Sequence, residues 1–320
     1  WQVAIGAGFA CGGFCIQFGC DWVAFLYASI AAILGMRLRQ VCNESGLNHY
    51  MGIAISAFVA TIIAWASTLL PAEWTSTPWH PLLACALFIV PGVPLINFVD
   101  DMLDNYIQVG IVRAVNTLLM VAAMAFGIAF AVKLCHIENF FPTISMVPHH
   151  QYWEYAIAAA ISAMGFSMIF NIQRRLLWVV AIGGIIAVCT RNFVNLGPST
   201  DNIGLDMGLV IGSFSGAVLV SLIAIKAVHW FHVPNHVLTI PSVIPMIPGV
   251  LMYRMLFGII NINVQSIDQV TPLMKAIESG VNSGLVIMCI ALGVAIPNIF
   301  GRRFIASSKL RSFICIYLLF

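Results

Sequence analysis

Runs of about 20 apolar residues recur along nearly the whole of this 320-residue chain. A run of that length crosses the ~30 Å hydrocarbon layer of a bilayer when it is helical. Because lipid offers no hydrogen-bond partner to backbone groups, a spanning chain must be helical or form a closed barrel. These runs are too long, and alternate too weakly, to be barrel strands. The sequence therefore predicts an all-α, polytopic membrane protein.

The composition agrees with this fold class. Hydrophobic residues make up 61% of the chain and charged residues 8%, whereas a soluble globular chain carries about 25% charged residues. The apolar runs divide into ten expected spans. They lie near residues 2–19, 22–38, 48–70, 81–103, 107–134, 152–171, 175–193, 204–228, 237–260 and 272–299.

Four short blocks of the first half recur in the second half in the same order, and the offset grows only from 152 to 166 residues. The paired blocks are GGFCIQF (12–18) with MGFSMIF (164–170), MGIAISAF (51–58) with MGLVIGSF (207–214), VPGV (90–93) with IPGV (247–250), and VNTLLMVAAMAFG (115–127) with VNSGLVIMCIALG (281–293). We therefore expect two five-helix repeats. Their expected bounds are 1–135 and 152–303, with a linker at 136–151 and a C-terminal tail at 304–320.

An odd number of spans in each repeat would insert the second repeat upside down. The distribution of Lys and Arg supports this, because cytoplasmic loops carry an excess of these residues. With both termini cytoplasmic, the outside segments hold only Lys133 and Arg191. The inside segments hold Arg37, Arg39, Arg174, Arg175, Lys226, Arg302, Arg303, Lys309 and Arg311. The linker is then expected on the extracytoplasmic side.

Spans four and nine are interrupted at matching positions of the two repeats, at Pro91-Gly92 and at Pro248-Gly249. Proline cannot donate to the carbonyl one turn earlier, so each helix is expected to break there. Freed carbonyls attract cations, and the restarted helix presents amides that suit a carboxylate. Paired broken helices indicate the binding site of a secondary transporter. The alternative is that the prolines only kink the helices.

Ionisable residues within or beside the spans are candidates for ion coupling, because a charge in lipid needs a partner or a cavity. Arg254 and Glu278 lie at similar expected depth and should pair. Arg113 should meet Asp100 or Asp101 near the cytoplasmic side, although these aspartates could also form an ordinary solvated helix end. The amides of the spans either bind substrate or only join helices. They are Asn97, Asn116 and Asn282.

Other polar features carry less weight. His149 and His150 in the linker could bind a metal, but adjacent imidazoles point to different sides, so no metal site or cofactor is expected. His229, His232 and His236 are interpreted as interfacial.

The stretches VPGVPLINFVDDMLDNYIQVG and IPMIPGVLMYRMLFGI resemble the bacterial threonine/serine exporter family over most of residues 1–300. The resemblance implies one fused chain that exports small hydroxy amino acids, driven by an ion gradient, with protons as the expected ion. It carries over Asn97, Asp101, Tyr253 and Arg254 as candidate site residues. Family members usually have a cytoplasmic segment before the first span, which this sequence lacks.

We therefore predict a secondary active transporter, not an enzyme, in the bacterial inner membrane. Its expected partners are a small amino acid, a coupling ion and lipid, with no nucleic acid; homo-oligomerisation is left open. One alternative is a passive channel or facilitator, and another is a transporter for a different small carboxylate-bearing metabolite. An intramembrane enzyme is disfavoured because no catalytic constellation stands in the spans.

Overall fold

The computed structural model describes residues 1–69, 71, 74, 76–136, 150–198, 203–260 and 270–317, with side chains described as far as residue 300. Every regular element among these residues is an α-helix or a short 3-10 helix. The predicted all-α class is confirmed. Most of the expected linker, including His149, lies outside the described residues.

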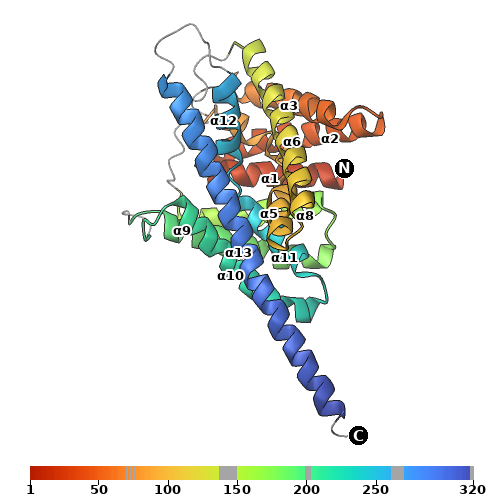
Figure 1. Ribbon diagram of the computed structural model, residues 1–320. Coiled ribbons are helices and arrows are strands. Elements are labelled where there is room, and N and C mark those ends of the chain that lie inside the picture. Colours follow the sequence, from red (N-terminus) through yellow and green to blue (C-terminus); the bar gives the residue numbers. More distant parts are fainter. Residues whose placement is uncertain are drawn as a thin grey trace.

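Six helical segments are long and apolar enough to cross a membrane. They are α2 (Trp22–Glu44), α3 (His49–Trp65) with η1 (Ala66–Leu69), α6 (Ile107–Leu134), η3 (Arg174–Leu176) with α9 (Leu177–Asn195), α10 (Leu209–Phe231) and α13 (Val270–Tyr317). Helix α13 continues without a break through most of the expected tail, and Figure 1 shows it extending beyond the other helices toward the C-terminus.

The other four expected spans are shorter or interrupted. Helices α1 (Gln2–Gln17) and α8 (Tyr152–Ile169) are continuous. Span four consists of α4 (Pro81–Ala84), η2 (Leu87–Ile89) and α5 (Gly92–Leu103). Span nine consists of α11 (Asn235–Val243), η4 (Ile244–Met246) and α12 (Gly249–Ile260). The two predicted breaks are therefore present.

Helices α1 and α8 pack closely along a line of small residues, which we call the α1–α8 seam. A Cβ atom added to Gly6 would lie 2.8 Å from the carbonyl oxygen of Gly165, and one added to Gly13 would lie 2.6 Å from that of Ala158. Small residues allow membrane helices to approach to this distance. Since the early part of α1 meets the late part of α8, the two helices run antiparallel.

The neighbours of each helix in the first half recur in the second half. Helix α1 packs on α2 as α8 packs on α9; the pairs α2–α3, α3–α6 and α5–α6 correspond to α9–α10, α10–α13 and α12–α13. Figure 1 shows the red and orange helices above and the green and cyan helices below, with α13 passing both groups. The α1–α8 seam joins the two groups.

Contacts between helix ends define two faces of the molecule. On the His150 face, the ring of His150 contacts the carbonyl of Cys20. On the Asp101 face, Asp101 pairs with Arg113. Helix α2, at 23 residues about 35 Å long, runs from Cys20 toward Tyr50, whose hydroxyl reaches Asn116 near the start of α6. The faces are therefore on opposite sides of the helices.

Exposed aromatic residues lie near both faces, as they do at the two interfaces of a bilayer. Those near the His150 face are Trp22, Trp74, Trp79 and Trp153, and those near the Asp101 face are Tyr106, Trp178 and Trp230. The apolar surface between these belts suits lipid.

Candidate functional site

The two helix breaks have the same backbone construction. In each, a 3-10 turn ends two residues before the proline, and the glycine after the proline donates its N–H back across it. Gly92 N donates to Val90 O at 2.7 Å, and Gly249 N donates to Ile247 O at 2.8 Å. At Pro91 the dihedral angles are φ −77° and ψ 64°, those of an inverse γ-turn. The α-helix restarts at the glycine in both cases.

The breaks touch each other. A Cβ atom added to Gly92 would lie 2.9 Å from Ile247 Cδ1, and one added to Gly249 would lie 2.6 Å from Leu87 Cδ2. Each glycine thus packs on the 3-10 turn of the opposite break. Pro91-Gly92 and Pro248-Gly249 thus face each other at contact distance.

This contact brings two helix N-termini together. The first turn of a helix has N–H groups without an intrahelical acceptor, and the macrodipole places partial positive charge there. Two such ends at one point favour an anionic group, as at helix N-termini that bind carboxylate or phosphate. The carbonyls of Leu87 and Ile244, to which Pro91 and Pro248 cannot donate, do not stay free: each accepts the N–H three residues further on, at 3.1 and 2.9 Å.

A small cavity lies where the breaks meet. Water-sized molecules can occupy about 10 Å³ of it, which is room for about one water. Its lining consists of Phe14, Leu87, Val90, Phe166, Ile244, Ile247 and Gly249. Six of these residues form pairs at equivalent positions of the two halves. An amino acid does not fit, so this conformation is closed at the breaks.

Phe14 and Phe166 were not among the predicted site residues, although they lie at matching positions of the repeated blocks at 12–18 and 164–170. Their rings meet edge to face with centroids 5.7 Å apart. Phe18 stacks on Phe14, and Phe170 stacks on Phe166. The four rings form an aromatic layer along the seam next to the cavity. Their matching positions in the repeat were the signal that could have identified them.

From the break, one face of α5 carries polar side chains at helical spacing, Asn97, Asp100, Asp101 and Asp104. Arg113 Nη1 lies 2.6 Å from Asp101 Oδ2, and the two side chains are 39% and 23% exposed. The predicted pairing of Arg113 with this aspartate pair is confirmed. Asn97 is half-buried between the break and the ion pair.

A further polar contact joins the two halves on the Asp101 face, and a polar contact within the second half lies beside it. His236 Nε2 lies 3.9 Å from Asp100 Oδ2, an ion pair when the ring is protonated. Beside it, Asn235 Nδ2 donates to Asn298 Oδ1 at 2.8 Å. The sequence suggested only an interfacial role for His236. Its position next to Pro234, at the start of the broken span, was the available signal.

Two of the remaining predicted site residues, Arg254 and Glu278, are not among the described residues that line the cavity. Arg254 is half-buried with its Nε atom shielded from solvent, and it occupies the position in α12 that Asn97 occupies in α5. Glu278 is exposed, and its pairing with Arg254 stays a prediction. The side chain of Tyr253 lies outside the described part of the chain.

The two predicted asparagines on the last span of each half differ in their surroundings. Asn116 is half-buried and accepts a hydrogen bond from the Tyr50 hydroxyl at 2.7 Å, which joins α3 to α6. Asn282 is exposed on α13. Neither is among the described residues that line the cavity. Their role in substrate binding stays a prediction.

Each half of the chain matches a family of known proteins. Residues 1–135 match the family described as "Putative threonine/serine exporter", and residues 155–300 match the one described as "Threonine/Serine exporter, ThrE". The chain belongs to the threonine/serine exporter family. This exporter-family chain is thus a multi-pass membrane protein of a transporter family.

Individual relatives of this threonine/serine exporter family member come from enterobacteria. The chain is 31% identical over 134 residues to the "Probable succinate transporter subunit YjjP" of Klebsiella aerogenes and, over the same length, to that of Escherichia coli. The match covers 42% of this chain and 52% of each relative, so the chain spans about half the length of the curated relatives it matches. No solved structure matches it.

Proposed function

We propose that the chain is a secondary active transporter that exports small carboxylate-bearing metabolites, with threonine and serine as the first candidates. The contact between the two Pro-Gly breaks carries this proposal. It brings two helix N-termini to one point, which suits the carboxylate of an amino acid.

The two halves act as inverted repeats in this proposal, with bounds 1–135 and 152–303, an extracytoplasmic linker at 136–151 and a tail at 304–320. The antiparallel α1–α8 seam supports inversion, because repeats of the same orientation would pair equivalent helices in parallel. Rocking of one half against the other at the seam would open the cavity to each side in turn. Both termini then lie in the cytoplasm of a bacterium, with the inner membrane as the location.

The coupling ion in this proposal is a proton carried on the Asp101 face. Asp101 lies on the polar face of α5 that leads from the break, and its salt bridge to Arg113 is partly open to water. A proton on Asp101 would release Arg113, which links the charge state of α5 to the position of α6. Asp100 is a second candidate through its contact with His236, and Glu278 is the alternative carrier.

Transport by the purified chain in proteoliposomes tests the proposal. Vesicles loaded with threonine, serine, succinate or alanine would be measured for efflux with and without an imposed pH gradient. We expect efflux of threonine or serine that the gradient accelerates. Equal rates with and without the gradient would instead indicate a passive facilitator.

A second candidate substrate class is a dicarboxylate. The printed name of the relatives refers to succinate transport, and two facing helix N-termini could each bind one carboxylate. Faster gradient-driven efflux of succinate than of threonine in the same vesicles would favour this class.

A further inference from the structure

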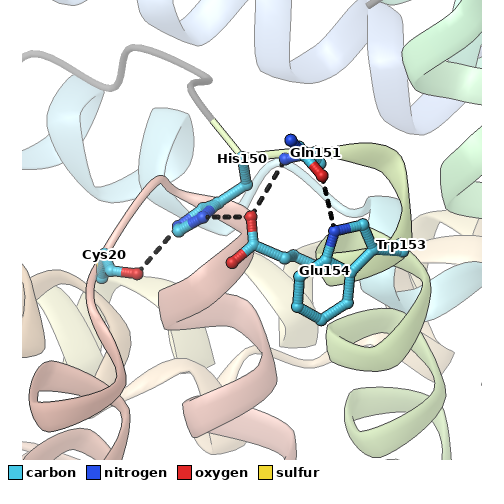
Figure 2. Close-up of polar contacts among 5 residues, drawn as sticks. All are labelled: Cys20, His150, Gln151, Trp153 and Glu154. Carbon is cyan, nitrogen blue, oxygen red and sulfur yellow. Dashed lines mark hydrogen bonds and ion pairs between the residues drawn. The ribbon is translucent and has the colours of Figure 1, made fainter. Parts of the chain in front are cut away.

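One histidine connects the turn between α1 and α2 to the start of α8 on the His150 face. His150 Nδ1 lies 3.0 Å from Glu154 Oε2, and His150 Nε2 lies 2.9 Å from the carbonyl oxygen of Cys20. Figure 2 shows the imidazole between these two oxygen atoms. The side chains of His150 and Glu154 are 12% and 18% exposed. A nearly buried ring thus connects the two halves of the chain.

Both atoms that the ring contacts are hydrogen-bond acceptors. A backbone carbonyl has no hydrogen to donate, so Nε2 must carry the hydrogen of that bond. Glu154 Oε2 already accepts the backbone N–H of Gln151 at 3.0 Å, as a carboxylate would. A neutral ring with its hydrogen on Nε2 would place the lone pair of Nδ1 against this oxygen. All three bonds are satisfied only when one further proton lies between Nδ1 and Oε2.

The carbonyl of Cys20 is held in position by the turn that carries it. Helix α1 ends at Gln17; Gly19 in the turn after it has a φ of 86°, and Cys20 N donates to Cys15 O at 3.2 Å. This left-handed ending favours glycine. Asp21 then caps the start of α2. Because the turn is fixed from both sides, the acceptor cannot easily turn away when the ring loses its proton.

The other ionisable groups around the ring have contacts of their own. The ring of Tyr155 meets that of His150 edge to face, with centroids 5.9 Å apart. The guanidinium of Arg191 on α9 donates to the side chain of the next residue at 3.1 and 3.2 Å. The carboxylate of Asp21 accepts two backbone N–H groups at 2.7 and 2.8 Å. Among the residues that the structure describes, Glu154 is the carboxylate in direct contact with the ring.

We propose that His150 and Glu154 form a proton-binding clasp that fastens the two halves together on the His150 face. With the proton bound, the imidazolium donates to Glu154 and to Cys20. When the proton leaves Nδ1 for water, the charge of the pair falls by one and two lone pairs face each other across the same 3.0 Å. The clasp then opens, because one of its two bonds becomes a repulsion.

The position of the clasp gives it both a proton source and an effect. Trp153, 57% exposed, donates to Gln151 Oε1 at 2.7 Å beside the clasp, in the manner of an interfacial anchor. Protons can therefore exchange with the aqueous phase. The clasp closes one end of the α1–α8 seam, whose Phe14 and Phe166 line the cavity between the breaks. This proton site is separate from Asp101 and lies on the opposite face.

The test measures thermal unfolding of the full chain in detergent micelles between about pH 5 and pH 9, around the ordinary range of histidine titration. If the clasp closes only with its proton, it stabilises the folded chain at low pH, and this contribution is lost as the pH rises. We expect the parent Tm to fall by about 2–5 °C through this range. In His150→Gln the Tm should fall much less over this pH range, because glutamine can still donate to the carbonyl of Cys20 but cannot titrate. His136→Gln, at an exposed histidine on the same face, should keep it.

Glu154→Gln provides a second variant, because glutamine preserves the helix-capping role of this position. The Tm of this variant should depend less on pH than that of the parent, as in His150→Gln. NMR of protein labelled with 15N in the histidine rings should show hydrogens on both ring nitrogens of His150 at the pH of highest Tm. A parental pH dependence in both variants, or a bare Nδ1 at that pH, would overturn the clasp. Neither readout depends on transport, so a failed transport assay leaves this test intact.

Discussion

Gly92 and Gly249 show how single residues determine the contact between the two breaks. Neither has a positive φ angle, so the backbone itself does not demand glycine. Glycine is needed here for a steric reason, because a Cβ atom at either position would overlap side-chain atoms of the opposite break. Residues next to proline at these positions therefore set how closely the halves approach.

Gly249→Ala should destabilise the closed state by about 1–3 kcal/mol through overpacking against Leu87. We expect a lower Tm and slower exchange transport in proteoliposomes. Leu87→Ala in the same chain should restore part of both, because it removes the atoms that clash. Gly284→Ala is the matched control, since a Cβ atom there meets nothing within 4 Å. Equal behaviour of Gly249→Ala and Gly284→Ala would argue against close packing of the breaks.

Asp101→Asn should abolish gradient-driven efflux while preserving substrate exchange, which needs no net proton movement. The change in stability should stay below about 1 kcal/mol, because the salt bridge to Arg113 is partly exposed. Efflux and exchange in the same vesicles measure the two effects separately. Asp104→Asn, at the exposed end of the same helix, is the control. Parental gradient-driven efflux in Asp101→Asn would exclude this residue as the proton carrier.

At the scale of elements, the α1–α8 seam and the paired breaks share one property. Each brings the backbone of a glycine in one half into contact with the other half, with its backbone at the seam and with its side chains at the breaks. Small-residue packing of this kind provides association in lipid, where burial of apolar surface gives no net driving force. The seam should therefore tolerate polar changes at its ends better than added volume at its centre.

Gly165→Ala tests the seam. Its Cβ atom would clash with the backbone of Ala10, which cannot move as a flexible side chain can. We expect a loss of about 2–3 kcal/mol in the free energy of unfolding, at the upper end of ordinary overpacking. Gly52→Ala on α3 is the control, since its nearest atom would be 3.4 Å away, an ordinary contact. Unfolding followed by tryptophan fluorescence compares the two; a similar small effect for both would indicate a loose seam.

At the scale of the whole molecule, the contacts place His136 at the end of α6 on the His150 face and Asn171 at the end of α8 on the Asp101 face. Both residues are exposed and have left-handed φ angles of 52° and 53°. They therefore form a matched pair for measuring how the chain lies in the membrane.

In a functional background without other cysteines, His136→Cys should react with a membrane-impermeant maleimide added outside intact cells. Asn171→Cys should react only after permeabilisation. This outcome follows from ten crossings with both termini cytoplasmic. Labelling of both positions from outside would contradict the opposite placement of the two faces, and the reverse pattern would invert the proposed orientation.

The sequence by itself determined the fold class, the places of the breaks and the pairing of Arg113 with one of Asp100 and Asp101. These features depend on composition, on proline and on the distance along one helix hairpin, all of which can be read locally. The repeated blocks also indicated that the Pro-Gly breaks are equivalent.

Only the tertiary structure decided which apolar residues face inward. Lipid-facing and buried surfaces are both apolar in a membrane protein, so hydrophobic periodicity does not distinguish Phe14, which lines the cavity, from Phe9, which is exposed. Contacts between distant segments could not be predicted from the sequence for a second reason. The contacts from His150 to Cys20 and from His236 to Asp100 depend on how the two antiparallel halves align. Close packing of glycine and alanine on the α1–α8 seam sets that alignment.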